Sequence, residues 1–226
     1  GREPMILRRS DGYIGTLIDD LVTKGTNEPY RMMTSRSEYR LLHRQDNADK
    51  RLSGIGLRIG LVSEGQYRRV LDKYAAVDAE LRRLEKTHIA PSDGINALLT
   101  ARGTAEISTG SSLADLIRRP QISYRDLAEF DPERPELPRA VTEQAEISLK
   151  YEGYIKRQLK QVEEFTRMES RPLPADIDYD AINGLRLEAR EKLKKIRPEN
   201  FGQASRISGV SPADISVLMI YMEGGR

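Results

Sequence analysis

Two long stretches of apolar residues at helical spacing limit most strongly what this chain can fold into. From Ser63 to about Lys86, and again from about Thr142 to Met168, apolar residues recur at intervals of three and four. That spacing gives a helix one apolar stripe along its length. Ser63, with Gln66 three residues later, forms a capping box at the start of the first helix. The sequence therefore predicts two long amphipathic helices that bury their stripes against other helices.

Shorter helices are predicted by similar start signals. A serine followed three residues later by a carboxylate supplies the side-chain oxygen and the negative charge that a helix N-terminus needs. This pattern occurs at Ser35 to Glu38, Ser112 to Asp115 and Ser123 to Asp126. We find no sustained period-two alternation and no hairpin turn between β-branched runs. The predicted fold class is all-α.

Proline-rich segments divide the pattern. Residues 131–138 hold three prolines and must connect helices, and residues 171–176 hold two more. The second segment marks the start of a small C-terminal helical subdomain. Within it, short helices are predicted near 180–182, 186–196 and 200–208, followed by a last helix that opens at Ser211-Pro212 and is apolar on all sides.

Composition excludes several kinds of site. The chain has no cysteine, which rules out disulfide scaffolds, Cys-ligated metals and thiol nucleophiles, and fits a reducing cytoplasm. With only His43 and His88, a multi-histidine metal site is not expected, and both are predicted to be structural or surface residues. No apolar run is long enough to span a membrane.

Two further motifs have ordinary structural explanations. Gly54, Gly56 and Gly60 have a spacing that could suggest a dinucleotide loop, but helical, polar residues precede them where a strand is required. They are predicted to form a helix end and a turn. Asp19 and Asp20 are adjacent, and adjacent residues on a helix point about 100° apart. We therefore do not expect them to converge on one atom as an acid–base pair, and predict a partly exposed helix face.

Positive charge is concentrated in two blocks. Residues 31–60 carry seven Lys/Arg against three Asp/Glu, a net charge of +4, and residues 186–206 carry the same balance. Because the whole chain has a net charge of only +2, the remainder is acidic at −6. Such blocks are typical of polyanion binding. On a helix, Arg36, Arg40 and Arg44 would form a single line of guanidinium groups suited to phosphates.

Two other classes of function remain open from the residues alone. In the first, the long apolar stripes serve oligomerisation and the chain is a protein–protein scaffold. In the second, the chain is an autonomous enzyme. A nucleic-acid gel shift, the mass in solution and the visible spectrum of the purified chain distinguish them.

Four motifs resemble the C-terminal part of the MnmG (GidA) family, the tRNA uridine 5-carboxymethylaminomethyl modification enzymes. They are the run from Tyr13 to Leu42 and the segments 45–49, 151–155 and 202–209. The resemblance covers essentially the whole chain, with Met33 where the family usually has phenylalanine. It implies a fragment: residues 1–30 as the remnant of a flavin-binding domain, 31–170 as a helical tRNA-binding domain, and 171–226 as a small subdomain for partner docking.

The resemblance also implies an activity for the intact protein. Members bind FAD, use NADH and methylenetetrahydrofolate, and work with the GTPase MnmE at C5 of the wobble uridine of certain tRNAs. The intact protein is expected to be a cytoplasmic homodimer. This fragment is expected to bind tRNA and MnmE, to hold no cofactor or metal, and not to be catalytic by itself.

Candidate site residues follow from matching the family's motifs. The expected tRNA-binding residues are Arg31, Arg36, Arg40, Arg44, Arg157, Lys192 and Arg206. The expected partner-binding residues are Ile215, Leu218 and Tyr221, on the last helix. The arginines of the first block are also supported by their charge, whereas the partner-binding residues depend on the resemblance alone.

Overall fold

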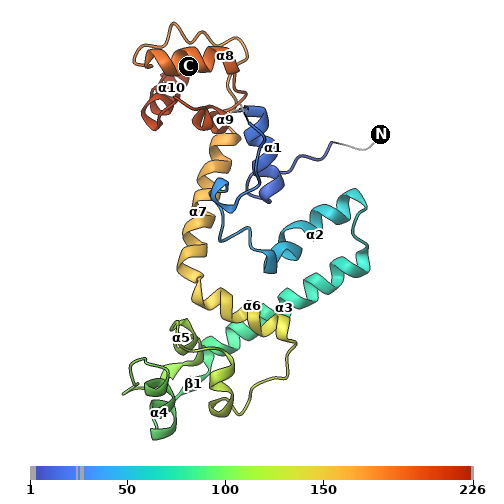
Figure 1. Ribbon diagram of the computed structural model, residues 1–226, viewed down its shortest axis with the longest axis vertical. Coiled ribbons are helices and arrows are strands. Elements are labelled where there is room, and N and C mark those ends of the chain that lie inside the picture. The colour runs from blue at the N-terminus through green and yellow to red at the C-terminus, as the bar shows by residue number, and fades with distance from the viewer. Residues whose placement is uncertain (1–3, 24, 26–27, 225–226) are drawn as a thin grey trace. The chain divides into compact units, whose positions relative to one another are not determined.

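The computed structural model describes residues 4–23, 25 and 28–224, and the chain divides into two compact units. One unit combines residues 1–43 with 157–226, and the other contains residues 44–156. These limits differ from the predicted domain limits at residues 30 and 170, because the N-terminal segment packs with the C-terminal helices. Nearly all of the regular secondary structure in the described residues is helical, which confirms the all-α prediction (Figure 1).

The unit 44–156 is a helical cluster with one minimal sheet. Its α-helices are α2 (Ala48–Ile59), α3 (Glu64–Lys86), α4 (Asp93–Ala101), α5 (Leu113–Arg118) and α6 (Arg139–Lys150). Short 3-10 helices span Gln45–Asn47 and Arg125–Phe130. Strands β1 (His88–Ile89) and β2 (Ser111–Ser112) pair antiparallel, with His88 opposite Ser112.

Helix α3 forms as its sequence predicts. The Ser63 hydroxyl accepts a hydrogen bond from the Gln66 backbone N–H, and the Gln66 side chain accepts one from the Ser63 N–H. The apolar stripe of α3 packs on α6, where Tyr74 and Val77 meet Val141. The capping box and the stripe thus specify the same helix, which is why its bounds could be read from the sequence.

The predicted long helix from 142 to 168 is wrong, because it is two helices. Helix α6 ends at Lys150, and α7 (Glu152–Glu169) begins two residues later. Tyr151 between them has φ −106° and ψ 9°, outside the helical region. The apolar spacing continues across this break, so periodicity could not reveal it.

The predicted helix after Ser35 is also wrong. A short 3-10 helix, η1 (Thr34–Arg36), is followed by turns through residues 38–42. Glu38 does not cap a helix, because its carboxylate binds Arg9 instead. A local hydrogen bond comes from Ser37 instead, because its hydroxyl accepts a hydrogen bond from the backbone N–H of Tyr39 at 3.2 Å. A contact 29 residues away in sequence therefore overrides a local start signal.

The unit made of residues 1–43 and 157–226 is built around the C-terminal bundle. It contains α1 (Tyr13–Thr23), part of α7, α8 (Leu187–Ile196), α9 (Phe201–Arg206) and α10 (Pro212–Gly224). The predicted short helix at 180–182 is absent, and those residues lie in a turn and the segment after it. The core of the bundle includes Tyr179, Leu193, Phe201 and Leu218.

The start of α10 is held by an ionic cap. Asp214 accepts hydrogen bonds from the backbone N–H and hydroxyl of Ser211, and it forms an ion pair with Arg186 at 2.6 Å. The Arg186 hydrogen bond, followed by those from Ser211, lowers the pKa of the buried Asp214 carboxyl well below its usual range, against the opposing effect of burial. The folded protein thus stabilises the charged carboxylate form of Asp214.

Replacing Asp214 by asparagine is expected to remove a pH-dependent part of the stability. Because the folded-state pKa lies below the unfolded value of about 3.9, this contribution is present above that pH and is lost as the pH falls towards the folded-state pKa. Asp214→Asn should cost about 1–2 kcal/mol at pH 7 and much less at pH 2. Urea unfolding at both pH values measures this, with the exposed Asp176→Asn as the control. Equal losses at the two pH values would contradict it.

Candidate nucleic-acid interface

Arg9 is the centre of an internal charge network in the unit 1–43/157–226. Its guanidinium is 4% exposed and contacts three carboxylates: Nη1 lies 2.9 Å from Asp19 and 2.7 Å from Asp20, and Nε lies 2.8 Å from Glu38. Burial by itself would lower the pKa of Arg9, but the bonds from Glu38 and Asp20 outweigh it and raise the pKa. The expectation that Asp19 and Asp20 could not reach one atom is wrong, because Arg9 extends between them.

Arg206 extends this network to the last helices. It is 7% exposed, its Nη2 donates to Asp19 Oδ1 at 2.8 Å, and its Nη1 lies 3.0 Å from Glu169. It therefore links α1, α7 and α9 through buried ion pairs. The expectation that Arg206 contacts tRNA needs correction, since its guanidinium is enclosed and occupied by carboxylates of its own chain.

The predicted line of guanidinium groups at Arg36, Arg40 and Arg44 does not form, because no helix connects them. Arg36 is half-buried and stacks over the ring of Tyr30 at 4.4 Å. Arg44 belongs to the other unit, where its Nε lies 3.1 Å from Asp46. The prediction that these arginines share one helical face is therefore wrong. The structure places Arg36, Arg40 and Arg44 in three different environments.

Tyr30 and Asp46 keep Arg36 and Arg44 in these places. The Tyr30 hydroxyl donates to Asp20 at 2.7 Å, and burial together with this bond raises the pKa of Tyr30. Burial by itself would raise the pKa of Asp46, but hydrogen bonds from Gln144 and Arg44 lower it below its usual range. Both arginines are thus partly engaged within their own units.

The turn that contains Arg40 is fixed to α7 by a glutamine. Gln158, on α7, accepts a hydrogen bond from the backbone N–H of Leu42 at 3.2 Å and donates one to the carbonyl of Glu38 at 3.0 Å. Both ends of the turn that contains Arg40 are thereby fixed to α7, one residue from Arg157. Arg40 and Arg157 are both exposed.

Lys160 is a third cation at this place, and the sequence analysis did not single it out. It follows Arg157 by three residues on α7, so the two side chains are neighbours on the helix surface. That spacing was available in the sequence. Among the described residues, no carboxylate forms an ion pair with Arg40, Arg157 or Lys160. We call these three residues the α7 cation face.

His43 supports the same turn from inside. It is buried, with Nδ1 3.0 Å from the hydroxyl of Ser37 and Nε2 3.0 Å from the carbonyl of Ser10. His88 is exposed beside Lys86. The prediction that both histidines are structural or surface residues is confirmed.

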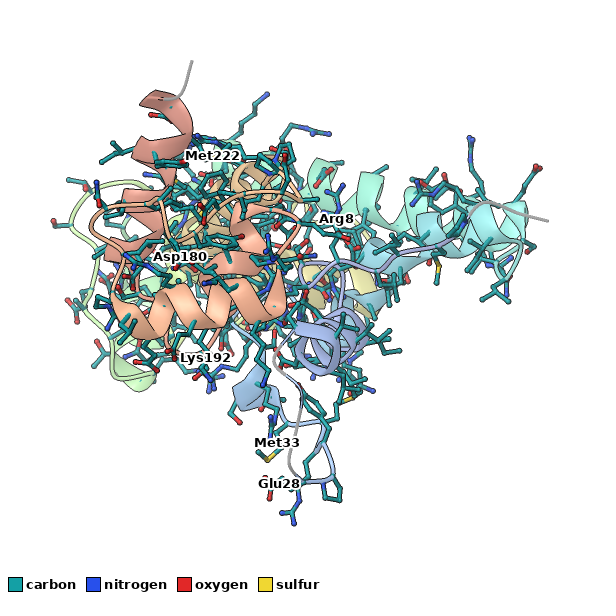
Figure 2. All side chains as sticks on the ribbon, turned by 90° about the horizontal axis from the view of Figure 1, so that it is seen from above. Arg8, Glu28, Met33, Asp180, Lys192 and Met222 are labelled. Atoms are coloured by element: carbon teal, nitrogen blue, oxygen red, sulfur yellow. The ribbon has the colours of Figure 1, made fainter. Side chains whose placement is uncertain are left out.

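Arg31 and Lys192, two other expected tRNA-binding residues, are exposed but do not belong to the α7 cation face. Arg31 lies in the extended segment after Glu28, and Figure 2 shows Glu28 and Met33 at the end of this projecting loop. Lys192 lies on α8 in the C-terminal bundle. Among the described contacts, none joins Arg31 or Lys192 to the α7 cation face.

The expected partner-binding residues divide between core and surface. Ile215 and Leu218 are buried in the bundle, so the prediction that they contact a partner is wrong: they pack against Phe201 and its neighbours. Tyr221 is 40% exposed, and the adjacent Ile220 is 69% exposed. Among the described residues of α10, Ile220 and Tyr221 are the large apolar side chains that are exposed.

The glycines considered as a dinucleotide loop form a helix end. Gly54 and Gly56 lie within α2, and Gly60 ends it with φ 81°, the left-handed conformation that favours glycine. A cradle for FAD would need the glycines between a strand and a helix. These described residues therefore do not fit that cofactor. No helix in the described part of the chain is long and apolar enough to cross a membrane.

The helical fold agrees with what known proteins show. Residues 64–159 match the C-terminal helical domain of the tRNA modifying enzyme MnmG/GidA, and residues 161–226 match the C-terminal helical bundle of the same family. The junction between these two matches lies close to the limit of the compact units at residue 157.

Individual relatives match nearly the whole chain. The tRNA uridine 5-carboxymethylaminomethyl modification enzyme MnmG of Caldicellulosiruptor saccharolyticus is 58% identical over 99% of this chain, and that of Enterococcus faecalis is 56% identical over 100%. A crystal structure of Aquifex aeolicus GidA (form II) superposes with a TM-score of 0.76 at 42% identity over 98% of this chain. The chain spans 36% of the length of these two curated relatives and 34% of the crystallised chain.

The matches and the fold together define the class: this is the C-terminal helical region of a tRNA modifying enzyme family. The chain belongs to the MnmG/GidA family.

Proposed function

We propose that this chain is the tRNA-binding helical region of an FAD-dependent enzyme that modifies C5 of the wobble uridine of tRNA. The observation that carries the proposal is the α7 cation face, three exposed cations on one turn and one helix without carboxylate partners among the described residues. Unpaired cations at a surface attract a polyanion, and tRNA is what the names of the relatives specify as their substrate.

Several residues take part in this proposal in different ways. Arg40, Arg157 and Lys160 would contact phosphates directly, with Arg31 and Lys192 as outlying contacts. Arg36 stacks on the ring of Tyr30, so we propose that it contributes less to phosphate binding than the exposed cations do. Tyr154 is 59% exposed and lies three residues before Arg157 on α7, so it would offer one ring for base stacking beside these phosphate contacts.

The catalytic chemistry is proposed to lie outside this chain. When bound, FAD would supply the redox chemistry, with NADH and methylenetetrahydrofolate as co-substrates, and this chain would position tRNA for it. We propose MnmE as a protein partner, with Ile220 and Tyr221 as its apolar contact on the bundle. The longer protein is proposed to be a cytoplasmic homodimer.

A gel shift tests the proposal against an oligomerisation scaffold. The chain alone is expected to retard tRNA at low salt, because its cation face neutralises phosphates, and to lose this binding steeply as salt rises. Size-exclusion chromatography of the same sample, with and without MnmE, gives its mass. A chain that self-associates but does not retard tRNA at any salt concentration would favour the scaffold.

A further inference from the structure

A hollow lined by arginines lies on the surface of the unit 44–156. It has a volume of about 570 Å³, and the residues that line it include Tyr124, Arg125, Arg134, Arg139, Thr142 and Glu146. The three arginines come from three segments, namely the 3-10 helix at 125–130, the proline-rich connection at 131–138 and the start of α6. They lie outside both basic blocks of the sequence, so only the fold brings them to one place. We call this place the Arg134 hollow.

The acidic residues of the hollow already have partners. One carboxylate oxygen of Glu146 accepts a hydrogen bond from the backbone N–H of Tyr124 at 2.8 Å, and the other pairs with Lys150 at 2.8 Å. Glu143 pairs with Arg139 one turn away on α6. These carboxylates are therefore neutralised by groups other than the two remaining arginines.

Arg125 and Arg134 are those two arginines. Arg125 is exposed and Arg134 is half-buried. Among the residues that the structure describes, neither forms an ion pair with a carboxylate. Two guanidinium groups thus line one hollow without a counter-charge, and such groups bind anions through charge-assisted hydrogen bonds.

Arg134 is held in place by Tyr124. Its Cζ lies 4.0 Å from the centre of the Tyr124 ring, and its Nη1 donates to the Tyr124 carbonyl at 3.2 Å. The Tyr124 hydroxyl donates in turn to Glu80 at 2.8 Å, and burial together with this bond raises the pKa of Tyr124 to about 12. Stacking uses the flat face of the guanidinium and leaves N–H groups on its edge for an anion.

The backbone before Arg134 is fixed as well. Arg83, on α3, pairs with the buried carboxylates of Glu80 and Asp131, each at 2.7 Å. The carbonyl of Asp131 accepts a hydrogen bond from the backbone N–H of Arg134 at 3.1 Å. Because this network already orders the turn, Arg134 has less conformational freedom to lose when an anion binds.

Phosphate is the anion that suits this arrangement best. The edge of a guanidinium group donates parallel hydrogen bonds to the oxygens of a phosphate. The whole hollow lies within residues 64–159, which match the C-terminal helical domain of a tRNA modifying enzyme family. We propose that Arg125 and Arg134 bind a backbone phosphate of tRNA, as a contact separate from the α7 cation face. This inference rests on the proposed function.

Phenylglyoxal footprinting of the unaltered chain tests the contact directly. The reagent modifies accessible guanidinium groups, and mass spectrometry locates the products. Saturating tRNA should reduce the modification of Arg125 and Arg134 by about fivefold or more, because a bound phosphate covers both groups. Arg82 is the matched control, since it is an exposed arginine on α3 of the same unit without a described ion pair. Unchanged modification of Arg125 and Arg134, or equal protection of Arg82, would overturn the proposal.

The same footprint with two other anions identifies the source of the phosphate. Inorganic phosphate and polyglutamate are each added at the same concentration of anionic groups as the tRNA. Both should protect Arg125 and Arg134 much less than tRNA does. Equal protection by inorganic phosphate would make the hollow a site for a small anion, and equal protection by polyglutamate would make it a site for an acidic protein. Either result would overturn the proposal.

Charge removal separates this inference from the proposed function. Arg125→Gln with Arg134→Gln should weaken tRNA binding about tenfold at low salt and make its log–log salt dependence shallower by roughly 0.7–0.9, the contribution of one phosphate. Arg82→Gln should bind as the wild type does. If the double variant is folded and binds like the wild type while Arg40→Glu/Arg157→Glu weakens binding, only this inference is wrong. A chain that retains no tRNA at any salt concentration would overturn both.

Discussion

Replacing Arg9 by methionine should destabilise the unit 1–43/157–226 by about 3–5 kcal/mol, because it leaves the buried carboxylate of Asp20 without its counter-charge. Methionine keeps much of the side-chain length, so the loss reports the charge and its hydrogen bonds. Asp20 is almost fully enclosed and would have to be protonated or hydrated. Urea unfolding followed by hydrogen exchange assigns the loss to this unit, and protection in 44–156 should be unchanged.

A double variant makes the cause of that loss testable. Arg9→Met with Asp20→Asn removes both the cation and its most buried partner, so it should recover part of the stability lost by Arg9→Met alone. Arg8→Met is the matched control, because the Arg8 side chain is exposed, and should change stability by less than about 0.5 kcal/mol. An Arg9→Met protein within 1 kcal/mol of the wild type would show that the network adds little.

Reversing two charges on the α7 cation face should weaken tRNA binding by about 100-fold, with almost no effect on folding. Arg40→Glu and Arg157→Glu each replace an attraction by a repulsion, and a loss of about 1.4 kcal/mol at each site corresponds to tenfold in affinity. Both side chains are exposed and without described ion pairs, so urea unfolding should be unchanged. Filter binding at low salt measures the affinity.

The matched control for that experiment is a charge reversal elsewhere. Arg68→Glu, on α3, alters an exposed arginine that pairs with Asp72 one turn away among the described residues, and should leave the affinity close to that of the wild type. If Arg68→Glu weakens binding as much as the double variant, binding follows net charge rather than this face.

Helices α3 and α10 were predictable because local and tertiary signals agree in them. Helix α3 has its apolar stripe, its capping box and its packing partner all consistent, and α10 has its serine, proline and acid in order at its start. The turn at 38–42 could not be predicted, because Glu38 is taken by Arg9 from another segment. Its sequence alone favours a helix that the folded chain does not form.

The candidate site was predictable in composition and not in geometry. Charge counting located Arg40 in a basic block. Its turn is placed against α7 by the hydrogen bonds of Gln158 with Leu42 and Glu38, which are 116 and 120 residues away from Gln158 in sequence. Lys160 was missed because it stands outside both basic blocks. Arg206 was misassigned for the opposite reason: its block is basic, yet its partners Asp19 and Glu169 lie far from it in sequence.

The salt dependence of tRNA affinity is the most direct test of the α7 cation face as the tRNA contact. Each phosphate contact contributes roughly 0.7–0.9 to the log–log slope of affinity against salt. The Arg40→Glu/Arg157→Glu chain should therefore show a slope shallower than the wild type by about 1.5. Parallel slopes for the two proteins would mean that these residues do not touch phosphates, and the tRNA assignment to this face would be wrong.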